Sequence, residues 1–164
     1  RRAIERDADG RREAGAPGEL DADALHPEIA GACRAYQQFC WDTQNVNWHS
    51  ELAIVSERWG YQGYLDRVGL VQGTPTLIDW KMGVAFPDDR TVTLQLAGYD
   101  LLYEELIDGG AERPDPATRI QQALVVLLRP DGTYAVRPVR ARADCQAFCA
   151  AVVVHRALTA WGTL

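Results

Sequence analysis

An aspartate and the only lysine of the chain stand two residues apart, as Asp79 and Lys81. Positive charge elsewhere comes from sixteen arginines. Lysine carries a compact ammonium whose pKa its surroundings tune readily, so it is not equivalent to arginine. An acid two residues before a lysine suits a site where the carboxylate holds a divalent metal and the ammonium orients a water or offsets phosphate charge. From these two residues alone, an ordinary surface ion pair is the commoner case. The neighbouring residues must therefore show whether the pair belongs to a metal site.

The pair is expected to lie on a short strand, residues 76–82. β-Branched and apolar side chains fill this stretch, and glycine or proline bounds it on both sides. Successive side chains of a strand point to opposite faces. Asp79 and Lys81 therefore share one face, and Ile78 and Trp80 share the other.

A second strand is predicted before it, from Tyr61 to Val71, after a turn at Gly60. Aspartate is disfavoured inside strands, so Asp66 needs a metal or a buried partner to explain its position. Alternation predicts one face with Tyr64, Asp66 and Val68, and an opposite face with Leu65 and Arg67.

The two strands are predicted to form a hairpin across residues 72–75. This pairing brings Asp66 and Asp79 close together at one end of a sheet. Neighbouring carboxylates repel unless a cation or a proton lies between them. The sequence therefore predicts a site for a hard metal, Mg²⁺ or Mn²⁺.

The remaining elements follow from periodicity and turn residues. Gln95 and Tyr99, four apart, lie on one face of their helix. The predicted elements are a helix from Pro27 with a buried stripe of Ile29, Cys33, Tyr36, Phe39 or Cys40, and Thr43; a strand from 52 to about 58; a loop at 84–90; a helix at 91–107; a loop to 116; strands at 120–128 and 133–139; and a last helix capped by Asp144 and running towards Trp161.

The length of 164 residues favours one domain. Residues 1–26 are polar and are expected to form an arm, and residues 27–164 the folded domain. The formal charge of −6 does not point to simple phosphate binding. No apolar run approaches a membrane span and no signal peptide is visible, so we expect a cytoplasmic location. Because the first residue is Arg, we expect the chain to begin inside a longer protein.

Four cysteines lie in two pairs, Cys33 with Cys40 and Cys145 with Cys149. The spacings match a helix and differ from the CxxC spacing of zinc sites. Small buried side chains on two helices are therefore favoured over a zinc site.

Three motifs in order resemble those of one nuclease superfamily. Residues 63–67 match Gly-x-x-Asp-Arg, residues 79–83 match Asp-x-Lys-x-Gly, and residues 95–99 match Gln-x-x-x-Tyr. They resemble the PD-(D/E)XK superfamily, and within it the RecB-like branch, which includes recombination, CRISPR-associated and phage exonucleases. The resemblance covers about residues 51–99 and implies a restriction-endonuclease-like αβββαβ core, a central mixed sheet flanked by helices.

The resemblance also implies a role for each matched residue. Lys81 would be the catalytic lysine, and Gln95 and Tyr99 would orient the substrate phosphate or the lysine. The metal ligands would be Asp66, Asp79 and the main-chain carbonyl of Trp80. Glu51 stands where such nucleases often have a further acid, and it either holds a second metal or is a strand-edge acid.

Three further features have two explanations each. His49 resembles a histidine found before the first motif in RecB-like nucleases, although a capping or surface role is favoured. Arg67 contacts phosphate or pairs with a neighbouring acid. The two-and-two cysteine pattern differs from that of the relatives with an iron–sulfur cluster, which argues against a cluster.

The expected function is that of a Mg²⁺- or Mn²⁺-dependent deoxyribonuclease of a bacterial or phage-infected cell. DNA is the expected substrate by resemblance, and an exonuclease is favoured because no region resembles a sequence-recognition module. The alternative is an inactive nuclease-like module that binds DNA or a partner within a larger recombination or phage protein. A homo-oligomer or a recombination partner protein fits either function, and no membrane is expected.

Overall fold

The computed structural model describes residues 21–109 and 119–160. The predicted arm lies mostly outside this part, apart from the short 3₁₀ turn η1 (Ala22–Ala24) at its end; so do the predicted loop from residue 110 to 116 and the helix end near Trp161. In chain order the other elements are α1 (Pro27–Asp42), β1 (Val46–Ser56), β2 (Tyr61–Val71), β3 (Thr74–Met82), α2 (Asp89–Gly109), β4 (Gln122–Leu128), β5 (Tyr134–Val139) and α3 (Ala141–Ala160).

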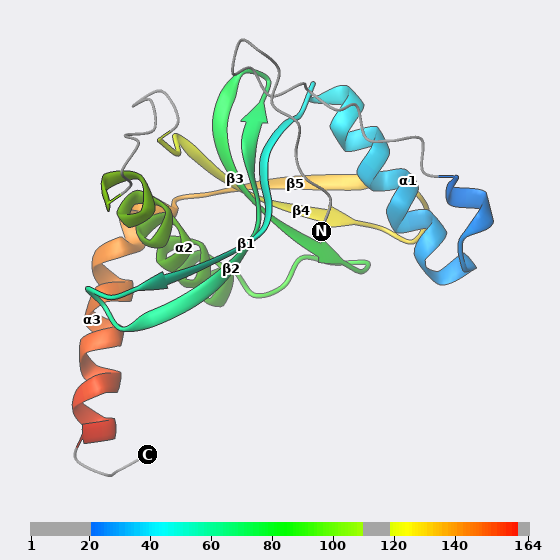
Figure 1. Cartoon of the computed structure of the whole chain (residues 1–164). Helices are drawn as coiled ribbons and strands as arrows, with labels where there is room; N and C mark the ends of the chain where they lie inside the picture. The colour runs from blue at the N-terminus through cyan, green and yellow to red at the C-terminus, as the bar shows by residue number, and fades with distance from the viewer. Residues whose placement is uncertain (1–20, 110–118, 161–164) are drawn as a thin grey trace.

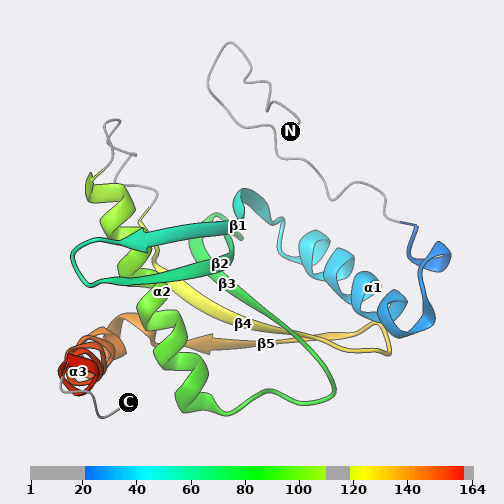
Figure 2. The ribbon, with the colours of Figure 1, turned by 60° about the horizontal axis from the view of Figure 1, so that its bottom comes forward.

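The five strands form one sheet in the order β1-β2-β3-β4-β5. Only β3 and β4 are parallel, and the crossover between them runs through α2, as parallel pairing requires. Helix α1 packs on β4 and β5, α2 packs on β1, β2 and β3, and α3 packs on α2 (Figures 1 and 2). The predicted α/β class, a mixed sheet flanked by helices, is confirmed.

The central strand β3 separates two apolar cores. Leu77 lies in the core under α2 with Leu65, Val68 and Leu96, and Ile78 lies in the core under α1 with Phe39. Because helices cover both of its faces, β3 carries large apolar side chains on both sides, Leu77 on one and Ile78 on the other, just before the acid and the lysine.

The β2–β3 hairpin is tighter than predicted. The strands pair up to Val71 and Thr74, and the turn consists of Gln72 and Gly73 alone. Both have positive φ angles, 50° and 77°, as a two-residue type I′ turn requires. Strand β3 therefore begins at Thr74, two residues before the predicted start, and Pro75 lies inside it.

Strand β1 is longer than its apolar run. The apolar run predicts a start at Leu52, but the strand begins at Val46 because β2 is long enough to pair with all of it. A register shift between Asn47 and His49 and a φ of 50° at Glu51 interrupt this first half. Because this half is polar and contains a bulge, it lacks the alternation of apolar and polar residues that would predict a strand.

The predicted faces of β2 are wrong beyond Asp66. Leu65 and Val68 belong to the same core under α2, although strict alternation would place them on opposite faces. Arg67 contacts Tyr36 of α1 instead. The change of face falls where β2 stops pairing with β3, after Arg67 and Ile78. A strand that loses one partner is free to twist, and alternation then fails.

Helix starts are set by side chains that cap them. Pro27 begins α1 as predicted. Asp88 accepts a hydrogen bond from the backbone N–H of Thr91, at 3.2 Å, so α2 begins at Asp89 and not at residue 91. Asp144 lies in the first turn of α3, which begins at Ala141, so its predicted capping position is wrong.

The stripe predicted for α1 is correct only at its C-terminal end. Phe39, Cys40 and Thr43 are buried, whereas Ile29 is 42% exposed. Alanines take its place in the core, at Ala30, Ala32 and Ala35, because the helix approaches the sheet closely.

The four cysteines are free thiols on α1 and α3, which lie at opposite ends of the sheet (Figure 1). Cys40 is buried and the other three are half-buried. Their place on two helices is confirmed. No helix in the described part of the chain is long and apolar enough to cross a membrane.

Candidate functional site

The first predicted acid lies where β2 and β3 separate. The last paired residues of the two strands are Arg67 and Ile78. One residue further on, Asp66 Oδ2 accepts a hydrogen bond from the backbone N–H of Trp80, at 2.9 Å. A side chain thus satisfies an N–H group that the neighbouring strand no longer pairs with. The predicted closeness of Asp66 to the Asp79–Lys81 stretch is confirmed.

Asp79 and Lys81 form an ion pair on one face of β3, as alternation predicts. Lys81 Nζ donates to Asp79 Oδ1 at 2.9 Å and lies 2.8 Å from Oδ2. The Asp79 side chain is 2% exposed and that of Lys81 is 29% exposed. The ammonium therefore reaches solvent while the carboxylate does not.

Burial raises the pKa of Asp79 above its ordinary value. The hydrogen bond and the charge of Lys81 oppose this rise, and the nearby charge of Asp66 adds to it. Oδ2 of Asp79 is buried and accepts no hydrogen bond of good geometry within the described residues. A buried carboxylate that Lys81 only partly compensates, with a second acid beside it, is a favourable place for a cation.

The donor set agrees with a hard divalent metal. Mg²⁺ takes oxygen ligands, commonly one or two carboxylates, and completes its shell with water and substrate. Asp66 and Asp79 supply two such groups. The described residues contain no cluster of three or more His, Cys, Asp or Glu side chains suited to a metal. Glu51 is exposed, and its place in the metal site, like that of the Trp80 carbonyl, stays a prediction.

Gln95 and Tyr99 lie together on α2, as predicted. Gln95 Nε2 donates to the Tyr99 hydroxyl at 2.8 Å. The Tyr99 ring packs on Gly63 of β2, where an added Cβ would lie 2.8 Å from Tyr99 Cε1. The glycine of the Gly-x-x-Asp-Arg motif thus leaves the space that this ring and the Leu102 side chain occupy. Orientation of a phosphate or of Lys81 by the pair stays a prediction.

Arg67 is buried and takes neutral partners, so the pairing with a neighbouring acid is wrong for the described residues, and contact with a phosphate stays a prediction. Its guanidinium donates to the Tyr36 hydroxyl at 2.6 Å and to Asn45 Oδ1 at 2.8 Å. It also lies over the rings of Tyr36 and Trp80, 5.2 and 5.5 Å from their centroids. Within the described residues no carboxylate pairs with it. Since 9% of the residue is exposed, it is also poorly placed for a phosphate.

Tyr36, Asn45, Arg67 and Trp80 form a cluster that connects the site to α1. Trp80, whose N–H holds Asp66, carries Arg67 on its ring and contacts Phe39 edge to face. The sequence pattern places Tyr36 only in a buried stripe and does not single out Asn45, so it reveals neither as a partner of Arg67. No local spacing could have revealed them, because they are remote from Arg67 in the chain.

His49 packs against helix α2. Its ring is half-buried and packs edge to face with Tyr103 of α2, at 6.2 Å between centroids. The favoured capping or surface role thus needs amendment, since the ring borders the core under α2.

The fold and the site together define an α/β protein with a five-stranded mixed sheet, in which two acids and a lysine meet where two strands separate. Comparison with models of protein families and with curated proteins found no match.

Proposed function

We propose that this protein is a metal-dependent nuclease of the PD-(D/E)XK superfamily, RecB-like branch, that hydrolyses phosphodiester bonds of DNA. The observation that carries the proposal is the meeting of Asp66 with the Asp79–Lys81 pair at the point where β2 and β3 separate. The order of elements from α1 to β4 agrees with an αβββαβ core. The three motifs lie in order on β2, β3 and α2.

Each side chain has a chemical task in this proposal. Asp66 and Asp79 would hold Mg²⁺ or Mn²⁺, which would polarise the scissile phosphate and acidify a water. The Lys81 ammonium reaches solvent beside Asp79, so it can offset the charge that develops on the phosphate. Because Asp79 is buried, water screens the attraction between its carboxylate and a metal ion poorly. The site would therefore bind a cation strongly.

The Trp80 N–H and Lys81 keep the two carboxylates in place before any substrate binds. Asp66 is held from the backbone and Asp79 from a side chain of the same strand. A preorganised charged site costs little reorganisation in the reaction. We propose exonuclease activity, since beyond the elements from α1 to β4 the described residues add only the short turn η1, strand β5 and helix α3.

The test is degradation of end-labelled linear DNA, single- and double-stranded, with Mg²⁺, Mn²⁺ or EDTA. We expect metal-dependent cleavage that Asp79→Asn and Lys81→Ala each reduce by about 100-fold or more. A matched control is Asp100→Asn, another buried aspartate of the chain, which should leave cleavage unchanged. Circular dichroism of every variant checks that the fold is intact.

Calorimetric titration with Mn²⁺ separates metal binding from chemistry. Asp66→Ala and Asp79→Asn should weaken binding, whereas Lys81→Ala should retain it. Metal binding without cleavage of any substrate would refute the enzyme and favour the alternative, an inactive module that binds DNA or a partner protein. Cleavage that survives in Asp79→Asn would refute the assignment of the site.

A further inference from the structure

Within residues 21–109 and 119–160, the hairpin of β1 and β2 has one covered and one open face. Helix α2 covers the face that carries Ile54 and Leu65, both in its core. The other face carries Val55, which is 66% exposed, and Tyr64, which is 60% exposed. Burial also alternates along this part of β2, so the open face is a regular strand face. A large aromatic ring thus stands in solvent without any packing need for it.

Tyr64 stands two residues before Asp66 on β2. Residues two apart on a strand lie roughly 6.6 Å from each other along it. Tyr64 is exposed and Asp66 is half-buried with its carboxylate turned to Trp80. An exposed ring therefore lies about one nucleotide's length along β2 from Asp66, one acid of the proposed site.

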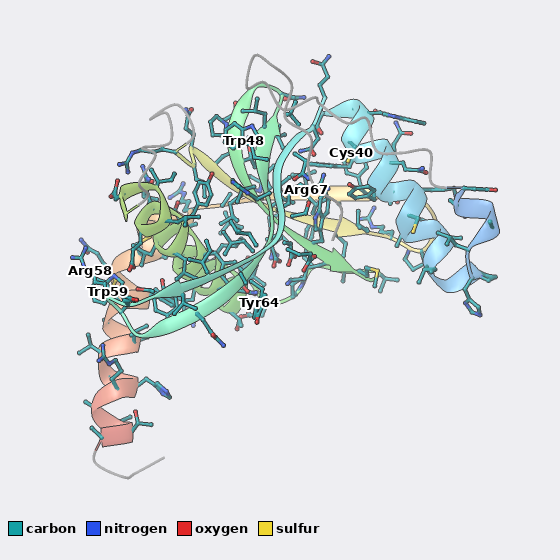
Figure 3. All side chains as sticks on the ribbon, in the orientation of Figure 1. Cys40, Trp48, Arg58, Trp59, Tyr64 and Arg67 are labelled. Atoms are coloured by element: carbon teal, nitrogen blue, oxygen red, sulfur yellow. The ribbon has the colours of Figure 1, made fainter. Side chains whose placement is uncertain are left out.

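The same hairpin carries a second aromatic and a cation at its tip. The exposed Arg58 lies over the ring of Trp59, 5.2 Å from its centroid. Figure 3 shows Tyr64 on the hairpin that ends in this pair. Aromatic rings with interspersed arginines are the means by which proteins hold single strands, through base stacking and phosphate contacts.

We propose that Tyr64 stacks on a base next to the scissile phosphate and that the preferred substrate is a single strand or a frayed end. This inference rests on the proposed nuclease function. Bases of an intact duplex are stacked on one another, so only an unpaired base can lie on an isolated ring. The acidic chain, with a formal charge of −6, also repels the dense charge of a duplex more than that of a single strand.

The test measures stacking directly and independently of cleavage. A short single-stranded oligonucleotide carries 2-aminopurine, whose fluorescence falls when it stacks on an aromatic ring. Binding is followed in Ca²⁺ with Lys81→Ala protein, with and without Tyr64→Ala or Tyr64→Phe. Trp41→Ala is the matched control, because Trp41 is equally exposed, at 63%, but lies on α1.

We expect Tyr64→Ala to weaken single-strand binding about fivefold or more and to remove the quenching. Tyr64→Phe should retain both, and Trp41→Ala should change neither. In the otherwise wild-type protein, Tyr64→Ala should slow cleavage of single strands more than that of duplex. Because the ring is exposed, the melting temperature should stay the same.

The outcomes separate this inference from the proposed function. Normal quenching and affinity in Tyr64→Ala would overturn the stacking role, even if the wild type cuts DNA. Loss of quenching in Tyr64→Ala, in a protein that cuts nothing, would uphold the stacking role and refute the nuclease. A wild type that binds and cuts duplex in preference to single strands would overturn the substrate assignment.

Discussion

Asp100, on α2, makes the folding stability depend on pH in an unusual direction. The residue is 3% exposed, and no described residue donates a hydrogen bond to its buried Oδ1. Burial raises its pKa to about 6; the Arg142 guanidinium opposes this and the charge of Glu104 adds to it. Arg142 Nε lies 3.7 Å from Asp100 Oδ2, too far to compensate for the burial.

The sign follows from proton binding. In the unfolded chain the carboxyl has a pKa of about 3.9. Between that value and the folded pKa of about 6, the folded state of Asp100 holds a proton that the unfolded state has released. Stability therefore falls as pH rises through this window and is level above it. Between about pH 4.5 and about pH 7.5 the loss amounts to about 2 kcal/mol.

Asp100→Asn removes this titration and keeps the shape of the side chain. We expect the variant to gain about 2 kcal/mol relative to the wild type as pH rises across the window, whatever the constant effect of the amide. Other titrating groups cancel in this difference. Urea unfolding, followed by tryptophan fluorescence at several pH values, measures it.

A second variant tests the stated causes. Arg142→Met removes the charge that holds the pKa of Asp100 down, so the pH window should extend upwards. If the stability difference between Asp100→Asn and the wild type stays constant across the window, the folded-state carboxyl titrates normally and the argument from burial is refuted.

Two further predictions concern packing. In Gly31→Ala the new Cβ would clash with the Pro130 carbonyl group, and α1 would have to retreat from the β4–β5 turn, costing about 3 kcal/mol in urea unfolding. Gly109→Ala, where nothing lies within 4 Å, should cost nothing, and a similar loss there would refute the clash. Arg67→Lys should cost about 2 kcal/mol, because an ammonium cannot replace both the bond to Tyr36 and the ring stacking; unchanged stability would refute the structural role of the guanidinium.

Local features of the chain were predictable because they depend on neighbours in sequence. Strand β2 has the predicted bounds, since an apolar and aromatic run follows a glycine with φ of 66° at Gly60. Pro27 begins α1 as expected. Asp79 and Lys81 share a face because alternation is a property of any strand, and a hairpin necessarily returns β3 past Asp66.

Other features were decided only by the tertiary structure. The partners of Arg67, the burial of Asp100 against α3 and the early start of β1 each depend on segments remote in the chain. The face of Val68 depends on where β3 leaves β2. Sequence patterns record the period of an element, whereas these contacts depend on how elements pack and where strands part. The residues that meet at the site were thus visible in the sequence, and the cluster that holds them was not.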